Sequence, residues 1–270
     1  MFEARGGRTV LAHSYAEPPF RILRAFDLGG AAYVILVCSG PGVFAGDTLR
    51  QSVRVGRGAR VVLTSQSALQ VHPAPRSHPA HPAHPARPAL FHQDYTVEED
   101  AELHCHWDPV IPFAGARLDQ LFDLRIAASS LLYWSDALMA GRVSRGEAWQ
   151  FESLTHELRL RIGSSLAYLE RYTLGPDDRA IQRPWMCAEA VYLATTLVHH
   201  AAATSEAAER LYRGVAGLDG VRAGVDRIAP DLVLARFLAA NGAPCARARA
   251  SCRTFALESI FGRPELVARK

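Results

Sequence analysis

The residues best suited to binding a metal ion stand close together in the segment Leu103-His-Cys-His-Trp-Asp108. As a β-strand this segment would place His104, His106 and Asp108 on one face, because side chains alternate between the two faces of a strand. Two histidines at positions i and i+2 lie about 7 Å apart, close enough to share an ion. Such a group could bind nickel or zinc, or form the centre of a hydrolase. The alternative is a pair of solvated histidines, because the spacing identifies no third histidine ligand.

A second set of histidines lies in the low-complexity segment 72–89, which reads HPAPRSHPAHPAHPARPA. His78, His81 and His84 are each followed by proline, which cannot donate to a strand ladder. The segment is therefore predicted to be a long surface loop between two strands. Its imidazoles could bind nickel, zinc or copper, at an entropic cost that weakens binding. The alternative is a repeat expansion with incidental metal affinity.

Two carboxylates directly follow glycines: Asp47 comes after Gly46, and Glu147 ends the segment Gly141-Arg-Val-Ser-Arg-Gly-Glu147. A carboxylate held inside a β-sheet scaffold must be paired or must face a cavity. Ordinary turn and surface charge is the alternative, and Arg142 and Arg145 are near enough in sequence to act as partners. The sequence leaves both interpretations open.

Motifs for covalent and phosphate chemistry are missing from the sequence. Neither G-x-S-x-G nor GxxxxGK[ST] occurs. The segment Gly40-Pro-Gly-Val-Phe-Ala-Gly46 has glycines at the spacing of a phosphate loop, but it precedes a strand-like segment and no helix. Its glycines are better explained by a tight bend that needs positive φ angles.

Composition narrows the class of protein. The 270 residues are 49% hydrophobic and 21% charged, which excludes general disorder and predicts a single domain over residues 1–270. A net charge of +3 is too small to indicate nucleic-acid binding. The longest apolar run, residues 31–38, is far short of the roughly 20 residues that span a bilayer. Five scattered cysteines without a CxxC pair favour a reducing cytoplasm over a disulfide framework or a structural zinc site.

Alternating apolar and polar residues predict strands in the first two thirds of the chain, for example at 49–55, 158–162 and 166–174. Regularly spaced glycines suggest turns between them. We therefore expect a β-rich scaffold over residues 1–180, built from antiparallel sheets that are stacked or helically wrapped.

The last part of the chain, residues 181–270, is predicted to be mainly helical. Helices are expected over the ranges 188–203, 205–214, 232–240 (capped by Asp231) and 244–261. Strands followed by helices indicate an α+β chain that is mainly β, with a few C-terminal helices packed on one side of the sheets.

Four short blocks occur in order along the chain, at residues 39–49, 55–65, 108–117 and 141–147. They resemble the GG-x-GGD-x-L, G-A-x-x-x-L-T-T, P-x-I-x-F-x-x-A-R and G-R-x-x-R-G-E motifs of the urease accessory protein UreD family, also called UreH. Further pieces at 234–237 and 260–264 extend the resemblance over about residues 20–265.

The resemblance implies a β-rich, layered fold and a non-catalytic role in the cytoplasm. A protein of this kind would bind apo-urease, recruit UreF and UreG, and help deliver nickel through an internal tunnel with a polar lining. No tightly bound cofactor is implied, only transient Ni²⁺, and neither nucleic acid nor membrane is an expected partner. Asp47 and Glu147 then become candidates for the lining of the nickel passage. The main alternative is a metal-dependent hydrolase centred on His104, His106 and Asp108.

Overall fold

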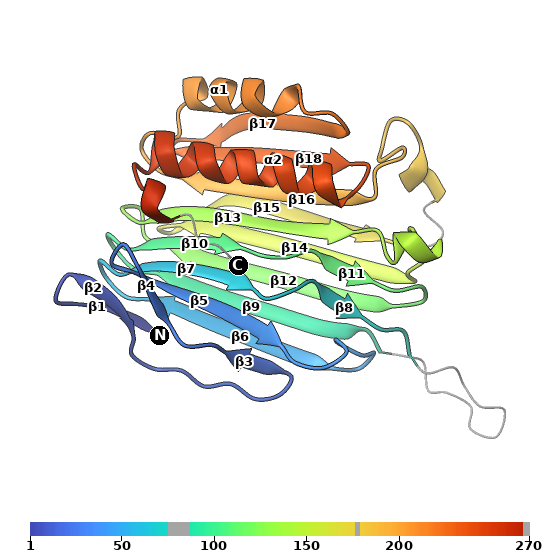
Figure 1. The fold of residues 1–270 in the computed structure, drawn as a ribbon, viewed down its shortest axis with the longest axis horizontal. Helices are drawn as coiled ribbons and strands as arrows, with labels where there is room; N and C mark the ends of the chain where they lie inside the picture. Colours follow the sequence, from blue (N-terminus) through green and yellow to red (C-terminus); the bar gives the residue numbers. More distant parts are fainter. Residues whose placement is uncertain (75–86, 176–178, 267–270) are drawn as a thin grey trace.

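Two β-sheets packed face to face form the body of the protein in the computed structural model, which describes residues 1–74, 87–175 and 179–266 (Figure 1). Sheet A has seven strands in the order β15-β14-β12-β9-β6-β1-β2. Sheet B has eleven strands, and its main path is β17-β18-β16-β13-β10-β7-β5-β3. The sandwich matches the expected α+β class with a mainly β content.

The strands of sheet A are β1 (Phe2–Arg5), β2 (Arg8–Leu11), β6 (Thr48–Val55), β9 (Ala89–Val97), β12 (Arg117–Ile126), β14 (Ser153–Ile162) and β15 (Ser165–Leu174). Those of sheet B are β3 (Phe20–Ile22), β4 (Phe26–Leu28), β5 (Ala31–Cys38), β7 (Arg60–Ser65), β8 (Leu69–Val71), β10 (Glu102–His106), β11 (Val110–Pro112), β13 (Leu131–Met139), β16 (Tyr192–His199), β17 (Val221–Ala229) and β18 (Leu232–Ala239). The helices are α1 (Ser205–Ala216) and α2 (Gly242–Phe255), with short turns at Val143–Arg145, Arg179–Gln182, Ala256–Ile260 and Pro264–Leu266.

The central strands run parallel, which corrects the expectation of antiparallel sheets. From β5 to β14 the chain alternates between sheets, so that β6, β9, β12 and β14 add to sheet A while β5, β7, β10 and β13 add to sheet B. A chain that visits the opposite sheet between neighbouring strands returns in the same direction each time, and the pairs become parallel. Antiparallel pairs remain toward the edges, as in β14–β15 and β13–β16.

The core between the sheets is centred on Trp134 of β13, which is fully buried. The rings of Tyr95 and Phe122 from sheet A meet it edge-on, with centroids 5.0 and 5.1 Å away. Aromatic pairs in this geometry add to the stabilisation that burial alone supplies. These ring contacts therefore hold the two sheets against each other around Trp134.

The expectation that residues 181–270 are mainly helical is wrong in two places. The ranges 188–203 and 232–240 contain strands β16 and β18, which are covered by α2 on one face and by the sandwich on the other. Both strands carry mainly apolar residues on both faces, with Arg236 of β18 as an exception, so their short apolar runs resemble those of buried helices. Asp231 accordingly precedes a strand and caps no helix.

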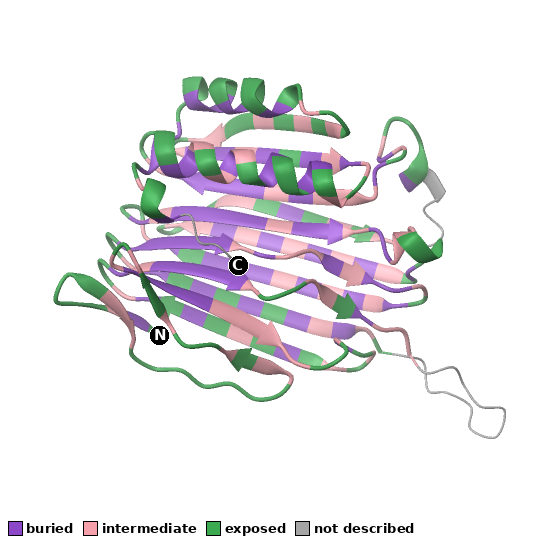
Figure 2. Ribbon diagram, in the orientation of Figure 1, coloured by how far each residue is buried: buried purple, intermediate pink, exposed green. Residues whose placement is uncertain are grey.

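The other two expected helices are confirmed as α1 and α2. Thr204 caps α1 by accepting a hydrogen bond from the amide of Ala207 at 3.2 Å, and Asn241 caps α2 by accepting one from Ala243. Both helices pack on sheet B, where Figure 2 shows the strands beneath α2 as buried. No helix in the described ranges is long and apolar enough to cross a membrane.

Candidate functional site

A cavity of about 590 Å³ lies between the two sheets. Sheet A lines it with β6, β9, β12, β14 and β15. Sheet B lines it with β13, β16, β17 and β18, and with parts of β3, β5, β7, β8 and β11. Sheet A contributes Gln51, Gln93 and Gln120, of which the first two share the hydroxyl of Tyr95 at 2.7 and 2.8 Å. The cavity therefore has polar side chains set into a mainly apolar lining, where a purely structural core would be apolar throughout.

Three carboxylates line the cavity, and two of them, Asp136 and Glu170, come from opposite sheets. Glu170 of β15 is paired with Arg236 of β18 at 3.0 Å, and it accepts hydrogen bonds from the hydroxyls of Tyr168 (3.2 Å) and Thr195 (3.3 Å). Asp136 of β13 has a buried Oδ1 atom that accepts no hydrogen bond from the described residues. Burial raises the pKa of Asp136 to about 7, and the nearby charge of Glu170 adds to this rise. Asp136 therefore exchanges between its neutral and charged forms near neutral pH.

The raised pKa of Asp136 predicts how the stability of the protein changes with pH. The folded state holds the proton of Asp136 up to about pH 7, whereas the unfolded chain releases it near the ordinary value of 3.8. The free energy of unfolding should therefore fall as the pH rises from 4 to 7, and Asp136→Asn should remove that loss. At pH 8 the variant should be more stable than the wild type by about 2–4 kcal/mol, and at pH 4 the two should be similar. Urea titrations of both proteins across this range measure the difference, and parallel curves would contradict the assignment.

An imidazole also faces the cavity. The ring of His156 on β14 stacks on Tyr172 of β15 with centroids 4.8 Å apart. Burial lowers the pKa of His156 to about 4, and the positive charge of Arg236 contributes to the decrease. At physiological pH the ring is neutral, which is the form that binds metals. The cavity thus offers carboxylate and imidazole donors, of which no three among the described residues are grouped to hold an ion.

His104 alternates as expected but is neither solvated nor open to a metal ion. It lies on the face of β10 opposite Leu103 and Cys105, under Phe261 and beside Tyr133. Its Nε2 atom lies 2.5 Å from a carboxylate oxygen of Glu102, and both side chains are almost fully buried. The short π-helical turn after α2 covers this face, which sequence periodicity could not indicate.

Asp108 does not share the face of His104. Strand β10 ends at His106, and beyond it Asp108 lines the inter-sheet cavity and interacts with Ser65 through its own amide and carboxylate. Within the described residues, no three His, Cys, Asp or Glu side chains are grouped so that they could hold a metal ion. His104, His106 and Asp108 are therefore not brought together as one centre.

Asp47 and Glu147 both lie in turns outside the cavity lining. Asp47 accepts a hydrogen bond at 2.8 Å from the amide of Phe44, and so closes the turn before β6. Glu147 is held by two hydrogen bonds from Arg142, at 2.7 and 2.5 Å, and accepts a longer one from the amide of Ala114. Their part in a nickel passage stays a prediction.

A stack of side chains connects these two turns. The rings of Phe44 and His72 lie 4.7 Å apart, and those of His72 and Phe113 lie 4.6 Å apart. The guanidinium of Arg142 covers Phe113 at 4.1 Å. Three blocks that are distant in sequence, 39–49, 108–117 and 141–147, thus meet at one end of the sandwich. The histidines expected to form a metal-binding loop, His78, His81 and His84, lie outside the described residues.

Sequence reasoning missed Asp136 and Glu170. The signal was present, because each is the single carboxylate of its strand, Leu131–Met139 and Ser165–Leu174. A charge in such a position needs a partner or a cavity. Only the fold shows that both face the same space.

The family model of the UreD urease accessory protein matches residues 1–270. A urease accessory protein UreD from Sorangium cellulosum is 31% identical over 207 residues, covering 77% of this chain and 63% of the relative. UreD from Trichodesmium erythraeum is 31% identical over 158 residues, 57% of this chain and 54% of the relative, so the matched regions span less than two thirds of both proteins. UreH from Helicobacter hepaticus is 24% identical over 176 residues, 65% of this chain and 66% of the relative. The chain belongs to the UreD family of urease accessory proteins.

Proposed function

We propose that this protein is a non-catalytic scaffold of urease maturation that binds apo-urease in the cytoplasm and, with UreF and UreG, assists the insertion of nickel into the urease active site. Nickel is the cargo of this scaffold, which holds no cofactor tightly. The inter-sheet cavity is the observation that carries the proposal, because it places isolated carboxylate and imidazole donors inside a β-sandwich.

The ligands that line the cavity favour the passage of a nickel ion over its tight binding. A tight site for a divalent ion needs three or four converging ligands, whereas single oxygen donors bind such an ion weakly. Asp136 offers an acceptor atom without a hydrogen bond from the described residues, and Glu170 is already neutralised in part by Arg236. An ion that meets one ligand at a time can keep most of its water and move on.

The proposal is tested by deleting the gene in cells that express urease and supplying it again from a plasmid. We expect urease purified from the deletion strain to hold little nickel and to regain it on complementation. Tagged protein should also retain purified apo-urease on a column. Full nickel occupancy in the deletion strain, or no retention of apo-urease, would contradict the proposed role.

The histidine-rich segment gives a separate prediction. The described residues on either side, Ala74 and Arg87, follow β8 and precede β9, so the segment connects strands of different sheets. Replacing residues 75–86 by a Gly/Ser linker of equal length should leave the melting temperature within about 2 °C, since loops tolerate such changes. If the histidines collect nickel, urease activation should fall only when nickel is limiting. A linker variant that unfolds would show that the segment has a structural role.

A further inference from the structure

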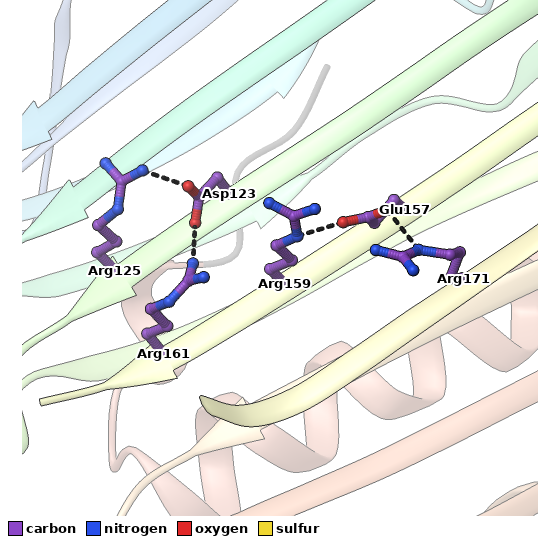
Figure 3. A network of polar contacts seen from close by, with 6 residues as sticks. All are labelled: Asp123, Arg125, Glu157, Arg159, Arg161 and Arg171. Atoms are coloured by element: carbon purple, nitrogen blue, oxygen red, sulfur yellow. Dashed lines mark hydrogen bonds and ion pairs between the residues drawn. The ribbon is translucent and has the colours of Figure 1, made fainter. Parts of the chain in front are cut away.

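Four arginines gather on the outer face of sheet A: Arg125 of β12, Arg159 and Arg161 of β14, and Arg171 of β15 (Figure 3). The four are defined here as the arginine patch. The helix contacts of the described chain are with sheet B, so this face of sheet A is open. Parallel pairing of β12 with β14 places Arg125 directly beside Arg161.

Two carboxylates bind the four arginines. Asp123 forms ion pairs with Arg125 and, at 2.8 Å, with Arg161. Glu157 forms ion pairs with Arg159 and, at 2.6 Å, with Arg171. Four positive charges stand against these two negative ones, and Asp94 of β9, in register beside Asp123, reduces the local excess to +1.

The geometry leaves the guanidinium groups available to a partner. The carboxylates lie deep, with side chains 11% and 13% exposed, whereas the four arginine side chains are between 34% and 57% exposed. A guanidinium has five N–H donors, and each of these four uses only one or two on its carboxylate. The buried carboxylates thus hold the arginines in place and leave most of their donors facing outward.

Apolar side chains border the patch. Leu169 pairs in register with Arg159, and Leu166 pairs with Arg161. Both leucines are about half exposed and lie on β15, the edge strand of sheet A, which pairs with β14. Positioned arginines beside exposed leucines form a surface with both charged and apolar contacts, and arginine is enriched in protein interfaces.

We propose that the arginine patch, with Leu166 and Leu169, is a docking surface for a protein partner that presents carboxylates around apolar side chains. Single-stranded nucleic acid would need exposed aromatic side chains for stacking, and these positions carry leucine and arginine. The inference goes beyond the proposed function, since it specifies the chemistry of a partner and assumes no particular maturation protein.

The test uses the purified full chain and a fluorescein-labelled ten-residue peptide of alternating Glu and Leu as the probe. We expect fluorescence anisotropy to show binding that weakens with salt, and a loss of at least tenfold in affinity in the double variant R161E/R171E. The milder R161Q/R171Q should show a smaller loss in the same direction, and L166S/L169S should weaken binding without changing its salt dependence. Arg213→Glu, an exposed arginine of α1, is the matched control and should bind as the wild type does.

Circular dichroism melts establish that each variant is folded. Equal affinity of the wild type and R161Q/R171Q for the peptide would overturn the proposal. Tighter binding of the wild type to a twelve-residue oligouridylate, or to vesicles with 30% phosphatidylglycerol, would also overturn it, because the patch would then recognise phosphate.

Discussion

Arg249→Ala should lower the free energy of unfolding by about 3–5 kcal/mol, although the residue lies on a helix at the surface of the sandwich. The side chain is 5% exposed and reaches from α2 into sheet B. There it donates hydrogen bonds to the carbonyl of Trp107 at 2.6 Å and to the carbonyl and hydroxyl of Ser135 at 3.1 and 3.0 Å. Alanine removes the guanidinium donor from the carbonyl of Trp107 and one of the donors to each oxygen of Ser135, and it opens a cavity under the helix.

Arg249→Ala should also change the pKa of Asp136, which faces the cavity. The positive charge of Arg249 opposes the rise in the pKa of Asp136, so its removal should raise that pKa further. Guanidinium denaturation of the wild type, Arg249→Ala and Arg249→Met measures the stability loss, and methionine should recover part of it by filling the space. Arg247→Ala is the control, because Arg247 is exposed and forms one long hydrogen bond, at 3.4 Å, to the carbonyl of Asp219. A loss below 1 kcal/mol for Arg249→Ala would show that α2 is held by its apolar contacts alone.

Local sequence patterns predicted the elements better than their arrangement. Alternation identified β6, β14 and β15, and start and stop residues predicted helices over 205–214 and 244–261, which contain most of α1 and α2, because each of these signals depends on neighbours along the chain. The parallel pairing arises because successive strands enter alternate sheets. No short-range signal in the sequence encodes which sheet a strand enters. The two strands mistaken for helices, β16 and β18, carry mainly apolar residues on both faces, so the sequence shows no clear alternation there.

The candidate site was harder to predict than the fold for a physical reason. His104 and Asp108 are close in sequence, yet the end of β10 at His106 places them on different sides of sheet B. Asp136 and Glu170 are far apart in sequence and belong to different sheets, yet both face one cavity. Spacing rules describe residues on one element, whereas a space between two sheets collects single residues from many elements.

If nickel passes through the cavity, Asp136→Ala should lower the nickel content of urease by about tenfold when nickel is limiting, the range seen when a supporting residue of a metal site is lost. Asp136→Glu should restore most of the transfer because it returns a carboxylate. Protons compete with nickel for Asp136, so transfer by the wild type should increase with pH through about 7, the pKa of this carboxyl group. Asp119→Ala is the matched control, because Asp119 lies on β12 next to cavity-lining Gln120 but on the opposite face.

The carboxylates outside the cavity give the comparison that decides where the passage runs. Asp47→Ala and Glu147→Ala remove the acceptor of a turn amide and the partner of Arg142, so each should lower the melting temperature and weaken binding to apo-urease. Asp136→Ala should lower neither property and should lose nickel transfer alone. Nickel per active site, pull-down of apo-urease and thermal melts, measured on the same variants, separate the two outcomes. If Asp47→Ala or Glu147→Ala lost nickel transfer while keeping stability and binding, the passage would extend to the end of the sandwich where Phe44, His72 and Phe113 stack. If Asp136→Ala transferred nickel normally, the cavity would not be the route.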